Sequence, residues 1–163
     1  MKFEYILLII LIIISIINFY YFFYGRRIKN KNNKYYQELQ LKLENKYSKY
    51  IKKNNITPLY KNLIVSDDNK GFIVLICNQL SKIIFIEEKS INQIDFKEIK
   101  KIDKIIEQDK KNLIKAEILI QTNDNVYIYK FGTKKRKLNS ILAKFIIDNC
   151  NSTYSSIEEL LNK

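Results

Sequence analysis

The stretch that most constrains this chain is residues 5–24, which read YILLIILIIISIINFYYFFY and carry no charged side chain. A helix of that length, at about 1.5 Å per residue, spans roughly 30 Å, the thickness of the hydrocarbon core of a bilayer. A secretory signal peptide instead has a shorter apolar region and a small-residue cleavage site. The stretch therefore predicts a retained N-terminal transmembrane helix, residues 1–25.

A basic segment follows the apolar stretch and contains Arg26, Arg27, Lys29, Lys31 and Lys34. The positive-inside rule places such a flank in the cytoplasm. We therefore expect a single-pass protein of the inner (cytoplasmic) membrane, with the N-terminus outside and a cytosolic C-terminal domain. Two interpretations of the charges remain open: they only set the topology, or they also attract anionic lipid of the bilayer.

Residues 26–57 are expected to form a juxtamembrane segment with an amphipathic helix over residues 34–53. Within residues 36–51, apolar side chains recur at spacings of three and four, which is typical of one helical face. They are Tyr36, Leu39, Leu43, Tyr47, Tyr50 and Ile51. The stripe has four possible partners: the rest of the chain, another protein, a second copy or the membrane surface. Pro58 and the preceding asparagines predict its end.

Residues 58–163 show the pattern of short strands separated by polar turns. Apolar runs predict strands at residues 59–65, 72–77, 82–87, 90–96, 113–122 and 126–131. Residues 98–108 fit either a strand or a helix by periodicity alone. A helical stripe follows, consisting of Leu138, Ile141, Leu142, Phe145 and Ile146, and a short last helix is expected near residues 155–161. The fold class is therefore α+β.

Four segments resemble bacterial PH-like domains: FIVLICNQLSKIIFIEE, IDFKEIKKIDKIIEQD, ILIQTNDNVYIYKFG and KLNSILAKFIIDN. The resemblance covers roughly residues 59–150 and consists of hydrophobic patterns without invariant polar residues. It implies an antiparallel sheet or partly open barrel closed by a C-terminal helix, and it favours a strand at residues 98–108. PH-like domains share a fold and not one function, since some bind lipid head groups and others are interaction platforms.

The chain lacks the residues of several common chemistries. It contains no histidine, which excludes histidine-based acid–base catalysis, nucleophile pairs and metal ligation. Cys77 and Cys150 are its only cysteines, too few and too distant for a zinc site or a disulfide framework. No glycine-rich phosphate loop occurs. We expect a membrane-anchored binding or scaffolding protein without catalysis, metal or cofactor. Two alternatives remain: a peripheral sensor of anionic lipid head groups, and an enzyme using Asp, Glu, Lys or Tyr.

The candidate site is the basic run Lys134, Lys135, Arg136 and Lys137, placed just before a predicted helix. Lysine and arginine side chains beside the N–H groups of a helix start favour an anion. The run is therefore a candidate site for an anionic ligand, including lipid head groups, although a solvated turn would have the same sequence. Nucleic acid is an unlikely partner, because Arg136 is the only arginine outside the juxtamembrane segment.

Overall fold

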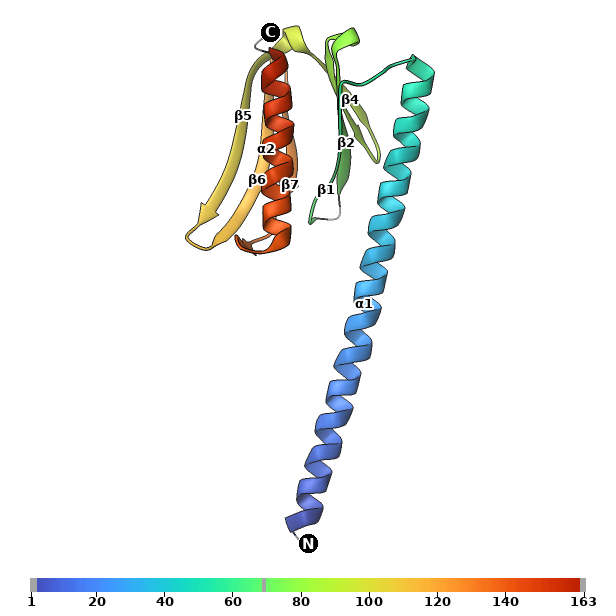
Figure 1. The fold of residues 1–163 in the computed structure, drawn as a ribbon, viewed down its shortest axis with the longest axis vertical. Helices are drawn as coiled ribbons and strands as arrows, with labels where there is room; N and C mark the ends of the chain where they lie inside the picture. Colours follow the sequence, from blue (N-terminus) through green and yellow to red (C-terminus); the bar gives the residue numbers. More distant parts are fainter. Residues whose placement is uncertain (1–2, 69, 162–163) are drawn as a thin grey trace. The chain divides into compact units, whose positions relative to one another are not determined.

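The computed structural model describes residues 3–68 and 70–161, and within helix α1 it describes the side chains of residues 5, 8, 10–22 and 34–54. The chain divides into two compact units between Glu38 and Leu39. Helix α1 (Phe3–Asn54) contributes to both, and Figure 1 shows it as one uninterrupted helix. The basic segment that follows the apolar stretch is thus helical.

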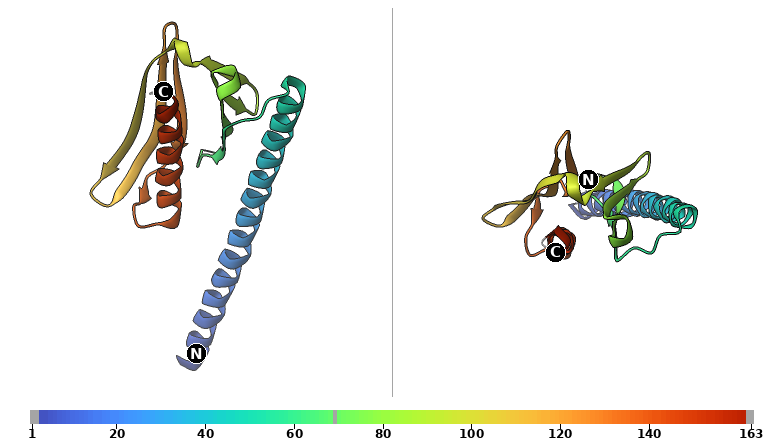
Figure 2. Two further views of the ribbon diagram at one scale, coloured as in Figure 1. Left: turned by 45° about the horizontal axis from the view of Figure 1, so that its top comes forward. Right: turned by 90° about the horizontal axis from the view of Figure 1, so that it is seen from above.

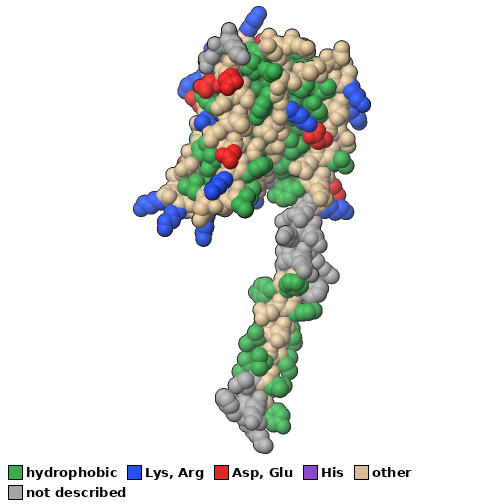
Figure 3. All heavy atoms as spheres, in the orientation of Figure 1, with side chains coloured by type: hydrophobic (Ala, Val, Ile, Leu, Met, Phe, Trp, Pro, Cys, Tyr) green, Lys and Arg blue, Asp and Glu red, His purple; other side chains and the backbone are tan. Residues whose placement is uncertain are grey.

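In the first unit, the large apolar side chains described between residues 5 and 22 are exposed, and they line the face of α1 drawn in Figure 3. Lys34 pairs with Glu38 at 3.9 Å, one turn further along the helix.

The expected transmembrane anchor, residues 1–25, is wrong. Among the described residues, no helix is long and apolar enough to cross a membrane. The single-pass topology, the inner-membrane location and the outside–inside orientation rested on that anchor and fall with it.

The second unit contains two antiparallel sheets and a C-terminal helix (Figures 1 and 2). The first sheet has the order β1 (Tyr60–Val65), β2 (Gly71–Cys77), β3 (Lys82–Glu87) and β4 (Ile91–Asp95). The second consists of β5 (Ile99–Asp109), β6 (Asn112–Thr122) and β7 (Val126–Gly132), with the short β8 (Arg136–Lys137) pairing with β6. Short 3-10 helices, η1 (Asn78–Leu80) and η2 (Phe96–Glu98), follow β2 and β4. The α+β class and the strand at residues 98–108 are confirmed.

The first sheet is buried on both faces, because alternate side chains of β2 and β3 enter two different cores. Phe72, Val74 and Ile76 point into the main core, between the first sheet, the second sheet and α2 (Ile141–Leu161). Ile73 and Leu75 point to the opposite face, where residues 39–54 of α1 cover them. An apolar run without polar alternation is typical of a strand buried on both sides.

The amphipathic stripe of residues 36–51 is largely used within the second unit. Leu39 and Leu43 are buried against the first sheet, and Tyr47, Tyr50 and Ile51 pack beside them. Burial of a leucine side chain contributes about 2 kcal/mol, so these two anchor the end of α1. This packing covers most of the apolar stripe and leaves Lys49 and Lys53 of the same helix exposed.

The predicted stripe of the closing helix is shifted. Ala143, Ile146 and Cys150 are buried, and Thr153 and Ile157 continue the same face for about two further turns. Ile141, Leu142 and Phe145, expected in the core, are exposed. One helix runs from Ile141 to Leu161, so the expected separate last helix does not exist. In Figure 1 this helix lies along the second sheet, and it contacts β1 as well as β5, β6 and β7.

Candidate functional site

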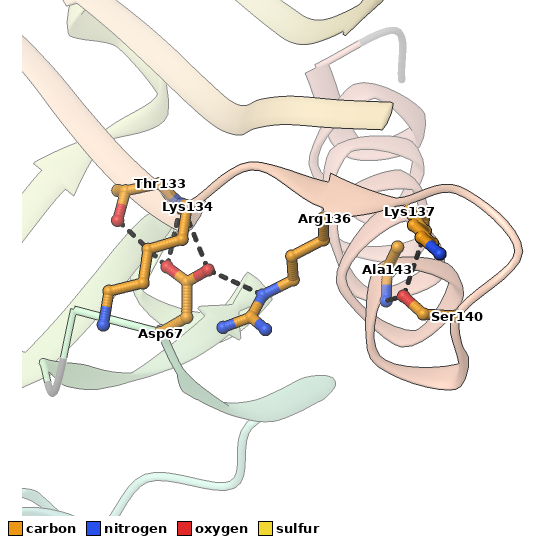
Figure 4. A network of polar contacts seen from close by, with 7 residues as sticks. All are labelled: Asp67, Thr133, Lys134, Arg136, Lys137, Ser140 and Ala143. Atoms are coloured by element: carbon orange, nitrogen blue, oxygen red, sulfur yellow. Dashed lines mark hydrogen bonds and ion pairs between the residues drawn. The ribbon is translucent and has the colours of Figure 1, made fainter. Parts of the chain in front are cut away.

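The four residues of the predicted basic site lie where β7 leaves the second sheet and turns into α2 (Figure 4). Lys134 and Lys135 lie in the connection after β7. Arg136 and Lys137 form β8, where Arg136 is opposite Leu113 and Lys137 is opposite Asn112 of β6. The structure therefore splits the run between a connection and a short strand.

A buried carboxylate, Asp67, organises this connection. Its Oδ1 accepts hydrogen bonds from the backbone N–H of Thr133 at 2.8 Å and from the Thr133 hydroxyl at 2.9 Å. Its Oδ2 accepts from the backbone N–H of Lys134 at 3.1 Å and from Nε of Arg136 at 3.0 Å. Figure 4 shows these contacts converging on one side chain, which follows β1 in the chain. Asp67 thus links the end of the first sheet to the end of the second.

The hydrogen bonds determine the ionisation of Asp67. Burial alone would raise the pKa of this carboxyl group, but hydrogen bonds from Thr133, Arg136 and Lys134 outweigh burial and place the pKa below its ordinary value. Asp67 is therefore an anion at neutral pH. Its carboxylate occupies the anion position that Arg136 and two backbone N–H groups provide.

The remaining members of the predicted run differ in their surroundings. Lys135 lies 3.7 Å from Asp109, in an ion pair whose partners are both exposed. Lys134 and Lys137 are exposed. The start of α2 is capped, because Ser140 Oγ accepts a hydrogen bond from the backbone N–H of Ala143 at 3.2 Å. The predicted contribution of a helix start to anion binding is therefore reduced by this cap.

Lys137 instead joins a hollow of about 550 Å³ at the end of the second sheet. We call it the basic hollow. It is lined by Lys110, Lys111, Asn112, Lys137, Leu138 and Asn139. Lys110 and Lys111 form the turn between β5 and β6, and Asn112 begins β6. The other three come from β8 and the segment before α2. Figure 3 shows Lys and Arg side chains gathered at the end of the molecule where the β5–β6 turn lies.

The electrostatics of the basic hollow favour an anion. Its lining contributes three ammonium groups, two amide side chains and no carboxylate. Among the described residues, Lys110, Lys111 and Lys137 form no ion pair, and Asp109 is paired with Lys135. Charges of one sign that line a concave surface raise the local concentration of ions of opposite sign.

Lys110 and Lys111 were missed because the sequence shows only a polar turn at this position. The pairing of β8 with β6 brings this turn beside Lys137, and a two-residue strand leaves no periodic pattern in the sequence. The sequence does show two adjacent lysines in this turn. They indicate an anion site only once the pairing of β6 with β8 places Lys137 beside them.

The juxtamembrane basic residues lie on α1, far along the chain from the basic hollow. Lys34 pairs with Glu38, while the side chains of Arg26, Arg27, Lys29 and Lys31 lie outside those described. Their predicted role in lipid attraction therefore stays a prediction.

The described residues provide no metal centre. No group of three or more Cys, Asp or Glu side chains in this part of the chain is placed to hold a metal ion. Cys77 and Cys150 are buried and unbridged, and burial raises the pKa of Cys150 to about 12, so its thiol is protonated at neutral pH. Burial also raises the pKa of Tyr129, which is stacked on Phe85 in the main core.

Comparisons with known proteins find no matching family model, no matching curated protein and no matching solved structure.

Proposed function

We propose that this chain is a non-catalytic binding protein whose PH-like module takes an anionic ligand at the basic hollow. The observation that carries the proposal is the meeting of Lys110 and Lys111 with Lys137 around one concave surface. These lysines come from two segments more than twenty residues apart, which the pairing of β6 with β8 brings together. A solvated turn needs no such convergence.

The lining of the basic hollow indicates the chemistry of its ligand. Lysine ammonium groups bind phosphate or carboxylate oxygens as point charges, and asparagine amides donate hydrogen bonds to the same atoms. Leu138 adds one apolar contact. The volume of about 550 Å³ lies within the range of small-ligand sites, so a phosphorylated or polycarboxylate group fits better than a flat surface.

The PH-like assignment is supported by the order of elements. Antiparallel strands followed by one C-terminal helix agree with the order that the resemblance implies, although the strands form two sheets and not one. Binding between loops at one end of a sheet is a common use of a rigid β scaffold. The fold alone does not define the ligand, which is argued from the hollow.

Catalysis is the weaker alternative for this hollow. An enzyme of this composition would require a carboxylate, lysine or tyrosine of altered pKa within reach of a substrate. The basic hollow is lined by no carboxylate and no tyrosine, and Asp67 accepts four hydrogen bonds and is fixed as an anion.

The proposal is tested with the full chain and inorganic tripolyphosphate, with binding measured by titration calorimetry at several salt concentrations. Changing Lys110, Lys111 and Lys137 to Gln removes the three charges, each contributing up to about 1 kcal/mol, so the affinity should fall roughly tenfold to a hundredfold. The matched control changes Lys89, Lys97 and Lys100 to Gln, which removes three exposed charges elsewhere.

A second experiment measures binding of the full chain to vesicles with and without anionic lipid. It distinguishes a lipid head group from a free phosphate as the source of the anion. Binding of tripolyphosphate that falls equally in both triple variants would contradict the proposal, because the effect would then be one of net charge and not of the hollow.

A further inference from the structure

A second groove lies between the end of α1 and the edge of the first sheet, within the second unit. It has a volume of about 410 Å³. Its lining consists of Lys46, Lys49, Tyr50, Lys53, Asn54, Ile91 and Gln93. The first five residues belong to α1 and the last two to β4, so one wall is helical and the other is a strand.

The helical wall carries a line of lysines at positions 42, 46, 49 and 53, a spacing that keeps them on one side of the helix. The first two hold the helix against the β3–β4 turn. Lys42 pairs with Glu88 at 3.1 Å, and Nζ of Lys46 donates to three backbone carbonyl oxygens of that turn at 2.8–3.3 Å. Lys49 and Lys53 are exposed, and within the described part of the chain neither forms an ion pair.

The strand wall is an open sheet edge. β4 is the last strand of the first sheet, and in the described residues no further strand pairs with its outer side. The backbone N–H of Glu87 bonds to the carbonyl of Ser90, and that of Phe96 bonds to the carbonyl of Ser81. Hydrogen-bonded pairs alternate along an antiparallel ladder, so residues 90, 92, 94 and 96 face β3. The backbone N–H and C=O groups of Ile91, Gln93 and Asp95 therefore point outward.

We propose that this groove binds an extended segment of a partner protein that pairs with β4 and carries acidic side chains toward Lys49 and Lys53. Backbone hydrogen bonds to Ile91 and Gln93 give the segment its direction and part of its affinity, as in other cases of strand addition. Alternate side chains of an added strand lie on one face of the sheet. The side chains on the α1 face meet the two lysines, and Ile91 and Tyr50 contribute the apolar floor.

The charges of the groove argue against a second copy as the occupant. Antiparallel pairing of two β4 strands would bring the lysine edges of two α1 helices toward one another, and β4 offers only Asp95 to offset them. Like charges placed together across an interface oppose association. An acidic segment from another protein meets the same groove with complementary charge. This site is separate from the basic hollow, so the two proposals fail or hold independently.

The test uses the full chain and an acetylated eight-residue peptide in which glutamate alternates with valine. Hydrogen exchange at the Ile91 and Gln93 amides should slow on addition of the peptide, while the Asn92 and Ile94 amides, already directed toward β3, should change little. The same peptide with lysine in place of glutamate should bind at least about tenfold more weakly, because it removes each attractive contact and adds repulsion.

Variants of the lysine edge provide the control. Lys49→Glu together with Lys53→Glu should lower the affinity for the glutamate peptide about tenfold or more and raise that for the lysine peptide. Lys100→Glu with Lys144→Glu makes the same change in net charge at two exposed sites away from the groove and should leave both affinities nearly unchanged. Gln93→Pro removes an outward N–H without breaking the ladder to β3 and should abolish the protection at Ile91.

Two results would overturn the proposal. One is an unchanged exchange rate at Ile91 and Gln93 with saturating glutamate peptide. The other is protection of these amides that rises with protein concentration alone, since the occupant would then be a second copy.

Discussion

Replacing Asp67 by Asn is the sharpest test of the structural argument, because it changes one atom of a buried group that joins the two sheets. Asp67 has a side chain only 4% exposed. Its two carboxylate oxygens accept four hydrogen bonds from Thr133, Lys134 and Arg136. An amide has one acceptor oxygen, so its NH₂ group must face two of these donors in either orientation.

The expected loss follows from the contacts that the amide cannot make. Hydrogen bonds to a charged group contribute about 1.5–3 kcal/mol each, and donors left unsatisfied in a buried place add a penalty. Arg136 remains 27% exposed and regains some solvation, which reduces the loss. We expect Asp67→Asn to lower the free energy of unfolding by roughly 3 kcal/mol. That is a large share of the about 5–15 kcal/mol that stabilises an ordinary domain.

Urea unfolding of the full chain at pH 7 measures this difference, and Asp68→Asn is the matched control. Asp68 accepts one backbone hydrogen bond at 3.3 Å and lies 4.0 Å from an exposed lysine Nζ, so its replacement should cost less than about 0.5 kcal/mol. The slope of the transition should be unchanged in both variants, because the surface exposed on unfolding is the same.

The pH dependence supplies a second readout. The pKa of Asp67 in the folded protein lies below that of an unfolded aspartate, about 3.9. Its contribution is therefore present above that value and is lost as the pH falls through the folded pKa. The difference between wild type and Asp67→Asn should narrow as the pH falls below about 4. A difference under about 1 kcal/mol at pH 7, or one that stays constant into acid, would refute the reasoning.

Two further predictions concern helix α2. Ile146→Asp should destabilise the protein by more than about 4 kcal/mol or prevent folding, because it places a charge in the main core. Phe145→Asp should change the free energy of unfolding in urea by less than about 0.5 kcal/mol, because Phe145 is 56% exposed. If Phe145→Asp destabilised the protein more than Ile146→Asp, Phe145 would lie in the core, as the sequence pattern predicted. Cys150, buried and with a pKa raised to about 12, should react with a thiol reagent at pH 8 only in denaturant, and fast labelling of the native protein would show that this helix face opens.

Most of the strands could be predicted from the sequence because their cause is local. Ile, Val and Phe runs separated by polar turns mark β2 and β3, and the structure confirms both within one residue. The burial of the closing helix could not be predicted as well. Leu142 and Phe145 are more hydrophobic than Ala143 and Cys150, yet the smaller pair lies inside. Close approach of a helix to a sheet favours small side chains, and a hydrophobicity pattern ranks them too low.

The candidate site was partly predictable for a related reason. Lys137 was identified from a run of charge, which is visible in the sequence. Asp67 and Lys110 acquire their roles only from contacts across more than twenty residues, which no local pattern contains. At residues 5–24 the error was of the opposite kind: a strong local pattern was present, and it predicted a membrane span that the described residues of the helix do not provide.

The buried faces of the first sheet explain why the end of α1 belongs to the same unit as the strands. The sequence pattern predicted that the strand-containing domain starts at residue 58, after the helix. Ile73, Leu75 and Ile86 point away from the main core and are fully buried in a second core, to which α1 contributes Leu39 and Leu43. Removal of this helix would uncover a continuous apolar sheet face, a surface that proteins rarely leave open. The boundary between the two units, at Glu38 and Leu39, thus lies where α1 begins to bury its side chains against the first sheet. The same part of α1 supplies the lysines that line the groove beside β4.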